Sequence, residues 1–112
     1  MRAANRARLS WQAIALAVAC LYHVENVAAA RQTHTVVIEG MQFHPASLTV
    51  RSGDLIVWRN QDLVPHTATA GGVFDSKAIG AQAAWSYIAR KRGTFQYVCS
   101  FHPTMKATLV VQ

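Results

Sequence analysis

Cysteine is scarce in this chain of 112 residues, which contains only Cys20 and Cys99. A small exported domain usually gains stability from several disulfides, and two cysteines cannot provide such a framework. Cys20 also lies in an N-terminal segment with the features of a removable signal, so Cys99 is the only thiol expected in the mature chain. An intrachain disulfide is therefore excluded there, and a lone thiol sent to an oxidising compartment needs protection.

Long apolar runs are also scarce, and the one present lies near the N-terminus. Three arginines among the first eight residues precede a mostly apolar stretch over residues 9–22, and small residues end at Ala30. We therefore expect a secretory signal peptide over 1–30, a mature domain over 31–112 and a periplasmic location. The run is broken by Gln12 and falls short of the roughly 20 residues that a stable membrane span needs. An uncleaved anchor and a lipoprotein lipidated at Cys20 stay open as alternatives.

Acidic residues are few. Residues 31–112 contain four of them against eight lysines and arginines, a formal balance of +4. Three of the basic residues, Arg90, Lys91 and Arg92, stand together before Gly93. A solvated hairpin turn accounts for this run, and a partner-docking patch is the alternative. No stripe of basic and aromatic residues accompanies it, so no nucleic acid partner is expected.

Helical periodicity is absent from residues 31–112, where short β-prone segments alternate with turn residues. Alternation over 93–99 places Phe95, Tyr97 and Cys99 on one face of a strand. The segment 74–82 is ambiguous between a loop, a turn of helix and an edge strand. About seven strands predict an all-β fold built as a β-sandwich. The expected strands lie in 33–40, in 47–60 as a pair around a turn at 52–54, and in 66–70, 83–89, 93–99 and 107–112.

Potential metal ligands gather near the C-terminus. The stretch "YVCSFHPTMKATLVV" over 97–111 places Cys99, His102 and Met105 three residues apart. Cys99 ends an expected strand, so a short loop lets the next two side chains curl back toward its sulfur. Two histidines and one cysteine with a weak axial methionine form the donor set of a type 1 copper site. The second histidine should come from another strand end, and His66 fits because it follows Pro65 and opens the segment 66–70.

Taken singly, each of these residues has a simpler explanation. A lone histidine after a proline is usually a surface residue, and a lone buried cysteine or methionine usually fills a core. Their combination in an exported chain with a single mature cysteine favours copper instead. His34 and His44 have no such setting, so we expect His44 to be a surface or structural residue and His34 to be solvated.

The segments "WRNQDLVPHTAT" (58–69) and "YVCSFHPTMKATLVV" (97–111) resemble the small blue copper proteins, the cupredoxins, and among these most closely the amicyanins. Plastocyanins and pseudoazurins are similar but place more residues between the histidine and the methionine. The likeness covers nearly all of 35–111. It implies a Greek-key sandwich of the cupredoxin type with one type 1 copper ion at one end. The implied ligands are His66, Cys99, His102 and Met105.

The resemblance also implies a function. A cupredoxin is an electron-transfer protein, not an enzyme by itself, and it shuttles single electrons by Cu(I)/Cu(II) cycling. We expect a monomer that exchanges electrons with redox partners such as a c-type cytochrome or a dehydrogenase or reductase. The expected electron port is His102, with Met41, Pro65 and Pro103 around it.

Two other classes of copper protein are alternatives to the shuttle. A copper carrier or storage protein is the main alternative, although such proteins tend to be rich in methionine or to carry paired cysteines. A fragment of a multicopper oxidase would need many more histidines than His34 and His44 supply. The sequence therefore favours the electron shuttle.

Two positions depart from the amicyanin pattern. Phe101 stands where amicyanins have proline, and its retained N–H could point at the Cys99 sulfur. Thr67 stands where they have asparagine, and whether its shorter side chain bridges to the Cys99 loop is open.

Overall fold

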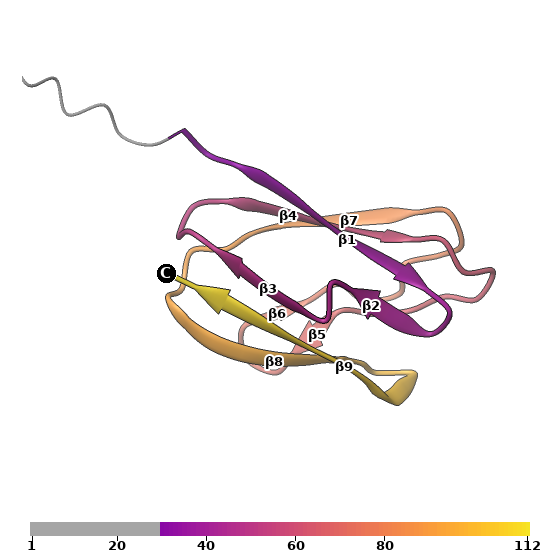
Figure 1. Cartoon of the computed structure of the whole chain (residues 1–112). Coiled ribbons are helices and arrows are strands. Elements are labelled where there is room, and N and C mark those ends of the chain that lie inside the picture. The colour runs from indigo at the N-terminus through magenta and orange to yellow at the C-terminus, as the bar shows by residue number, and fades with distance from the viewer. Residues whose placement is uncertain (1–29) are drawn as a thin grey trace, which may run out of the picture.

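The chain forms two β-sheets packed face to face (Figure 1). The computed structural model describes residues 30–112, which contain nine strands and no helix, and hence no helix able to span a membrane. The signal expected over 1–30 and Cys20 therefore fall almost wholly outside the described residues. The strands are β1 (Thr33–Glu39), β2 (Gln42–His44), β3 (Ser47–Val50), β4 (Leu55–Asn60), β5 (Thr69–Ala70), β6 (Phe74–Asp75), β7 (Ala84–Ile88), β8 (Gly93–Cys99) and β9 (His102–Val111).

The order of the strands shows how the two sheets are connected. One sheet has the order β2-β1-β4-β7 and the other β3-β9-β8-β5-β6. The pairs β1 with β4 and β3 with β9 are parallel, and the other pairs are antiparallel. A tight turn cannot join parallel neighbours, and the chain passes from one sheet to the other after β2, β3, β4, β6 and β7. The expected all-β sandwich is confirmed.

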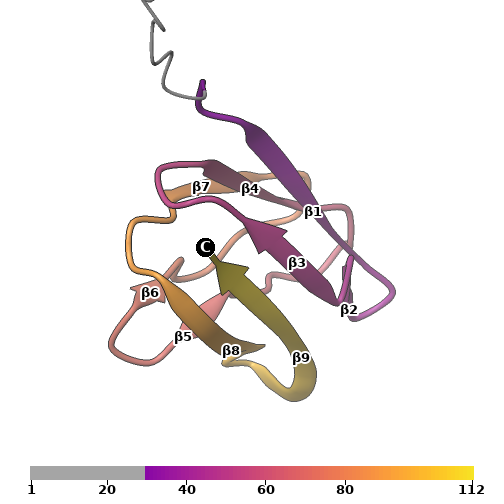
Figure 2. The same cartoon turned by 60° about the vertical axis from the view of Figure 1, so that its left-hand side comes forward.

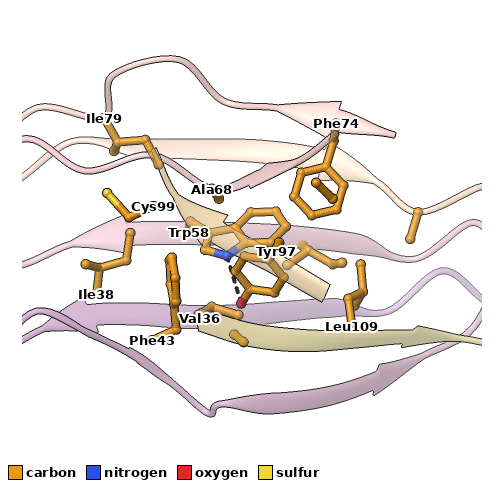
Figure 3. Close-up of a cluster of buried hydrophobic side chains, with 14 of the residues drawn as sticks. Val36, Ile38, Phe43, Trp58, Ala68, Phe74, Ile79, Tyr97, Cys99 and Leu109 are labelled. Carbon is orange, nitrogen blue, oxygen red and sulfur yellow. Dashed lines mark hydrogen bonds between the residues drawn. The ribbon is translucent and has the colours of Figure 1, made fainter. Parts of the chain in front are cut away.

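The core lies between the sheets and is centred on two aromatic side chains. Trp58 on β4 and Tyr97 on β8 are both buried, and the Trp58 Nε1–H donates a hydrogen bond of 3.2 Å to the Tyr97 hydroxyl (Figure 3). Their rings meet edge to face with centroids 5.6 Å apart. Tyr97 and Cys99 are buried and Phe95 is partly buried, so the face predicted for this strand is confirmed.

The predicted strands differ from the observed ones at their boundaries, and the short strand β2 was not predicted. The segments around β1, β3, β4, β7 and β8 were placed to within about one residue. By contrast, β5 begins three residues later than the expected 66–70, and β9 begins five residues earlier than the expected 107–112. The ambiguous stretch 74–82 contains β6 and an isolated bridge between His66 and Ile79.

The sandwich has two ends with different contents. The turns after β1, β4 and β8 lie at one end, on the right in Figure 1. The turns after β3 and β7, the start of β1 and the end of β9 lie at the other end. All four predicted ligands belong to the first end, since they lie in the loop after β4 or near the turn between β8 and β9.

Candidate metal centre

Cys99 and His102 flank the turn between β8 and β9. Cys99 is the last residue of β8, His102 is the first of β9, and the register of the pair shifts between Val98 and Cys99. The turn brings His102 Nδ1 to 3.5 Å from Cys99 Sγ. The three-residue spacing thus places a thiol and an imidazole at one point, as the sequence predicted.

His66 reaches the same point from a distant part of the chain. It lies before β5, and not at the start of a strand as expected. Its backbone pairs with Ile79 through two hydrogen bonds of 3.1 and 2.7 Å, which fix the loop. Its fully buried ring has Nδ1 3.7 Å from Cys99 Sγ. The second histidine therefore comes from a separate segment, as predicted.

The donor atoms of His66, Cys99 and His102 all lie within 4.8 Å of one another. Met105 follows on β9, three residues after His102, with only 4% of its surface exposed. Cys99 and His66 are fully buried, whereas His102 is partly exposed. The thiol is thus sealed from solvent, and His102 is the member of the group that reaches the surface.

Asp62 orients the His66 ring. Its Oδ2 lies 2.8 Å from His66 Nε2, and its carboxylate accepts hydrogen bonds of 2.8 Å from Gly40 N–H and 3.0 Å from Met41 N–H. The Met41 amide first, and then the Gly40 amide and the His66 ring, lower the pKa of Asp62 against the opposing effect of desolvation. An ionised Asp62 holds a proton on Nε2 and leaves Nδ1 free to face the sulfur.

Thr67 joins the two ligand loops. Its backbone N–H donates to Cys99 Sγ at 3.3 Å, and its hydroxyl oxygen accepts a hydrogen bond of 2.7 Å from Ser100 N–H. The Thr67, Thr69 and Ser100 hydroxyls lie within 3.2 Å of one another and form a small cluster. Thr67 therefore does bridge to the Cys99 loop. Within residues 30–112, the amide seen to donate to the sulfur is that of Thr67, so the role suggested for the Phe101 amide stays a prediction.

The remaining histidines lie away from the cluster. His44 is an exposed residue at the end of β2, with Nε2 3.2 Å from Glu39 O. His34 Nε2 lies 3.0 Å from Asp54 Oδ2 at the opposite end of the sandwich, so this ring is paired and only partly exposed. Neither residue lies with the candidate ligands, in agreement with the sequence prediction. The expectation that His34 is solvated was wrong, because its ring is paired with Asp54.

The donor chemistry fits copper. A thiolate and two imidazoles are soft to intermediate ligands, and the buried thioether of Met105 on β9 is a further soft donor that would suit copper. Within residues 30–112, every buried side-chain nitrogen or oxygen atom has a hydrogen-bond partner. The polar side chains that hold the loops around the site are therefore all paired.

Comparison with known proteins agrees with this geometry. The model of the cupredoxin-like domain matches residues 12–111. The chain belongs to the cupredoxin-like family. This cupredoxin is 30% identical over 81 residues to amicyanin of Paracoccus denitrificans, a match that covers 67% of the chain and 62% of the relative's length. It is 27% identical over 104 residues to amicyanin-alpha of Methylorubrum extorquens strain AM1, covering 88% of the chain and 86% of the relative.

Solved structures give the same picture. A Cu(I) form of an amicyanin mutant superposes with a TM-score of 0.68 at 28% identity and covers 75% of the chain and 86% of the mutant. A purple cupredoxin from Nitrosopumilus maritimus superposes with a TM-score of 0.67 at 22% identity, and the match covers 70% of this chain and 99% of the purple cupredoxin. At this identity the match supports the fold alone. The resemblance stated from the sequence is confirmed.

Asp62 and Thr67 are the site residues whose contacts sequence reasoning did not establish. No role for Asp62 followed from the sequence, and Thr67 stood out only as a departure from the amicyanin pattern. A carboxylate four residues before a ligand histidine is a weak signal, because many surface acids occupy such positions. Only the fold shows that the Asp62 carboxylate also binds the turn after β1.

Proposed function

We propose that His66, Cys99, His102 and Met105 bind one type 1 copper ion, and that the chain carries single electrons between partner proteins in the periplasm. The convergence of three donors from remote segments within 4.8 Å carries this proposal. Copper, when bound there, supplies exchange of one electron between Cu(I) and Cu(II).

The residues around the site suit a carrier. The Thr67 amide donates to the thiolate and so stabilises its charge, while Asp62 and the hydroxyl cluster of Thr67, Thr69 and Ser100 hold both ligand loops. Because the donors are already fixed, little rearrangement is needed when the charge of the site changes. Membership of the cupredoxin-like family supports an electron carrier and not an enzyme.

The surface around His102 suits electron exchange. Exposed large apolar side chains of the described residues all lie at the metal end, namely Met41, Leu63, Val64 and Phe101. Met41 belongs to the rim expected from the sequence, and the other three were not foreseen. Such a patch fits a short-lived contact with a c-type cytochrome or a dehydrogenase, in which the His102 ring provides the path.

A visible spectrum tests the copper site. With one equivalent of Cu(II), the protein should develop the intense absorption of a copper–thiolate bond, and Cys99→Ser should abolish it. His66→Ala should also abolish it, whereas His44→Ala serves as the matched control and should keep it. A colourless wild type, or a Cys99→Ser variant that still turns blue, would refute the proposal.

Redox cycling separates the shuttle from the copper carrier. A shuttle should show a reversible potential and rapid electron exchange with no loss of metal. A carrier should instead deliver Cu(I) to an apo acceptor without cycling. Retention of copper through repeated oxidation and reduction is the expected result.

The location follows from the signal that we propose over residues 1–30, with the domain over 31–112. Protein recovered from the periplasmic fraction should begin at Arg31, as mass spectrometry can show. A mass that includes a lipid on Cys20 would establish the lipoprotein alternative instead.

A further inference from the structure

Most of the positive charge lies at the end of the sandwich opposite the metal centre. Five of the eight lysines and arginines of residues 31–112 are there, and all five are exposed. They are Arg31 before β1, Arg51 after β3, and Arg90, Lys91 and Arg92 between β7 and β8. Hydrogen bonds join these segments, since Ser52 Oγ donates to Arg90 O at 2.8 Å. We call these five residues the basic end; Figure 2 shows the turn after β3 close to the connection between β7 and β8.

Negative charge does little to offset the basic end. Asp54 is the acidic residue there, and it is buried and turned inward to His34 and to the amides of Gln32 and Arg51. Of the other acids in residues 30–112, Glu39 and Asp62 lie at the metal end and Asp75 pairs with Lys77. Five positive side chains and the one negative charge of Asp54 give this end a formal charge of +4.

A hollow between two of the arginines adds a place for an anionic group. Residues 30 and 31 and residues 51–54 line a cavity of about 280 Å³ that opens at this end. Arg31 and Arg51 both line it, together with Ser52, Gly53 and Asp54, whose carboxylate oxygens are bound to the amides of Gln32 and Arg51 and to the His34 ring. A phosphate group is the anion that guanidinium groups recognise best.

The absence of apolar surface distinguishes the possible partners. Protein interfaces have an apolar or aromatic centre, yet the exposed large apolar residues of the described chain are all at the metal end. Adsorption to anionic lipid needs only basic residues near the headgroups. The basic end therefore fits a charged lipid surface better than it fits an acidic protein.

We propose that the basic end adsorbs to an anionic phospholipid membrane, with lipid phosphate between Arg31 and Arg51. Strand β8 runs between the two ends with seven residues, so about 20 Å separates the lipid surface from the metal centre. His102 and its apolar surroundings then face away from the membrane and stay open to partners.

Sedimentation with vesicles tests the proposal on the full chain as cells produce it. The protein should bind vesicles of phosphatidylcholine mixed with phosphatidylglycerol, should not bind phosphatidylcholine alone, and should be released by salt. Each basic residue near the surface contributes about fivefold to binding, so a variant with Arg90, Lys91 and Arg92 changed to glutamine should bind roughly 100-fold more weakly.

A matched control carries the same loss of charge elsewhere. Changing Arg59, Lys77 and Lys106 to glutamine also removes three positive charges, but it leaves the basic end intact and should weaken binding far less. Equal weakening in both variants would overturn the proposal, and so would binding that resists salt, since that would come from the N-terminal apolar segment. Salt-sensitive retention on an acidic protein without vesicle binding would assign this end to a protein partner and would also overturn it.

Discussion

At the residue scale, Asp62 determines which ring nitrogen of His66 points toward the metal centre. Its carboxylate lies 2.8 Å from Nε2, while Nδ1 lies 3.7 Å from Cys99 Sγ. A negative carboxylate at this distance makes the imidazole a stronger donor. Stronger donation favours the more highly charged state of a bound metal, so Asp62 should lower the reduction potential.

Replacement of Asp62 by asparagine tests this effect. Asp62→Asn keeps a hydrogen-bond acceptor but removes the charge, so the potential of the copper-loaded protein should rise by tens of millivolts, where about 59 mV corresponds to a tenfold shift in a one-electron equilibrium. Voltammetry provides the measurement. Glu39→Gln removes an exposed charge at the same end and should shift the potential much less, so equal shifts in the two variants would contradict the role of Asp62.

The proposed ligands could be placed near one another from the sequence because their spacing is local. Cys99, His102 and Met105 lie within seven residues, and a turn between two strands brings at least the first two together. The contacts of Thr67 and Asp62 could not be predicted in the same way. Both depend on partners in the tertiary structure, since Thr67 reaches Ser100 over 33 positions and Asp62 reaches Gly40 over 22.

At the element scale, Asp54 fastens the start of β1 to the turn between β3 and β4. Its carboxylate accepts hydrogen bonds of 3.0 Å from both Gln32 N–H and Arg51 N–H, and its Oδ2 lies 3.0 Å from His34 Nε2. The Gln32 amide, followed by His34 and the Arg51 amide, lowers the pKa of Asp54 from 3.8 to about 2. Asp54 thus holds three segments together in its ionised form.

The pH dependence of stability should show this fastening. A folded pKa of about 2 against 3.8 when unfolded means that the contribution of Asp54 is complete above 3.8 and is lost as the pH falls toward 2. Asp54→Asn should therefore be less stable than the wild type near neutral pH, and the difference should shrink in acid. Urea unfolding midpoints at several acidic pH values would measure it, and a constant difference would contradict the assignment.

The hydrogen bond between Trp58 and Tyr97 links the two sheets. Burial raises the pKa of Tyr97 to about 12, so its hydroxyl stays neutral and accepts the indole N–H. Tyr97→Phe leaves a buried donor without a partner and should lower the free energy of unfolding by about 1–2 kcal/mol. Denaturant titration would show this. Tyr87→Phe, at a partly exposed site on β7, should cost less, and a similar loss in both would argue against the inter-sheet bond.

Strand positions could be predicted where apolar and polar residues alternate clearly. The prediction failed where tertiary contacts set the end of a strand. The segment 93–99 alternates and matches β8 at both ends. The expected strand 66–70 was shortened at its start because the backbone of His66 pairs with Ile79 across a loop. β9 extends back to His102 because His102 pairs with Cys99 beyond a register irregularity, which no periodicity in the sequence revealed.

At the scale of the whole molecule, the site forms only when the sandwich does. Cys99 and His66 are separated by 33 positions, and the β5 to β8 contact and the Thr67 bridge bring their loops together. Copper binding should therefore raise the unfolding temperature, since the metal binds the folded chain preferentially. The same fold separates an apolar metal end from the basic end. A charge added at the metal end should therefore change the rate of electron exchange, and a charge added at the basic end should not.

Exchange between two copies of the protein tests this separation without an identified partner. Leu63 is 87% exposed at the metal end, and Leu63→Lys places like charges against each other when two copies meet there. Electron self-exchange, measured from NMR line broadening in mixtures of the reduced and oxidised copper forms, should slow by roughly threefold to tenfold at low salt and recover as salt is added. Thr94→Lys adds the same charge near the basic end and should leave the rate nearly unchanged. The difference is expected because an electron can pass only when contact at the metal end brings the two His102 rings close together. Equal slowing in both variants would show instead that the net charge of the protein controls the rate.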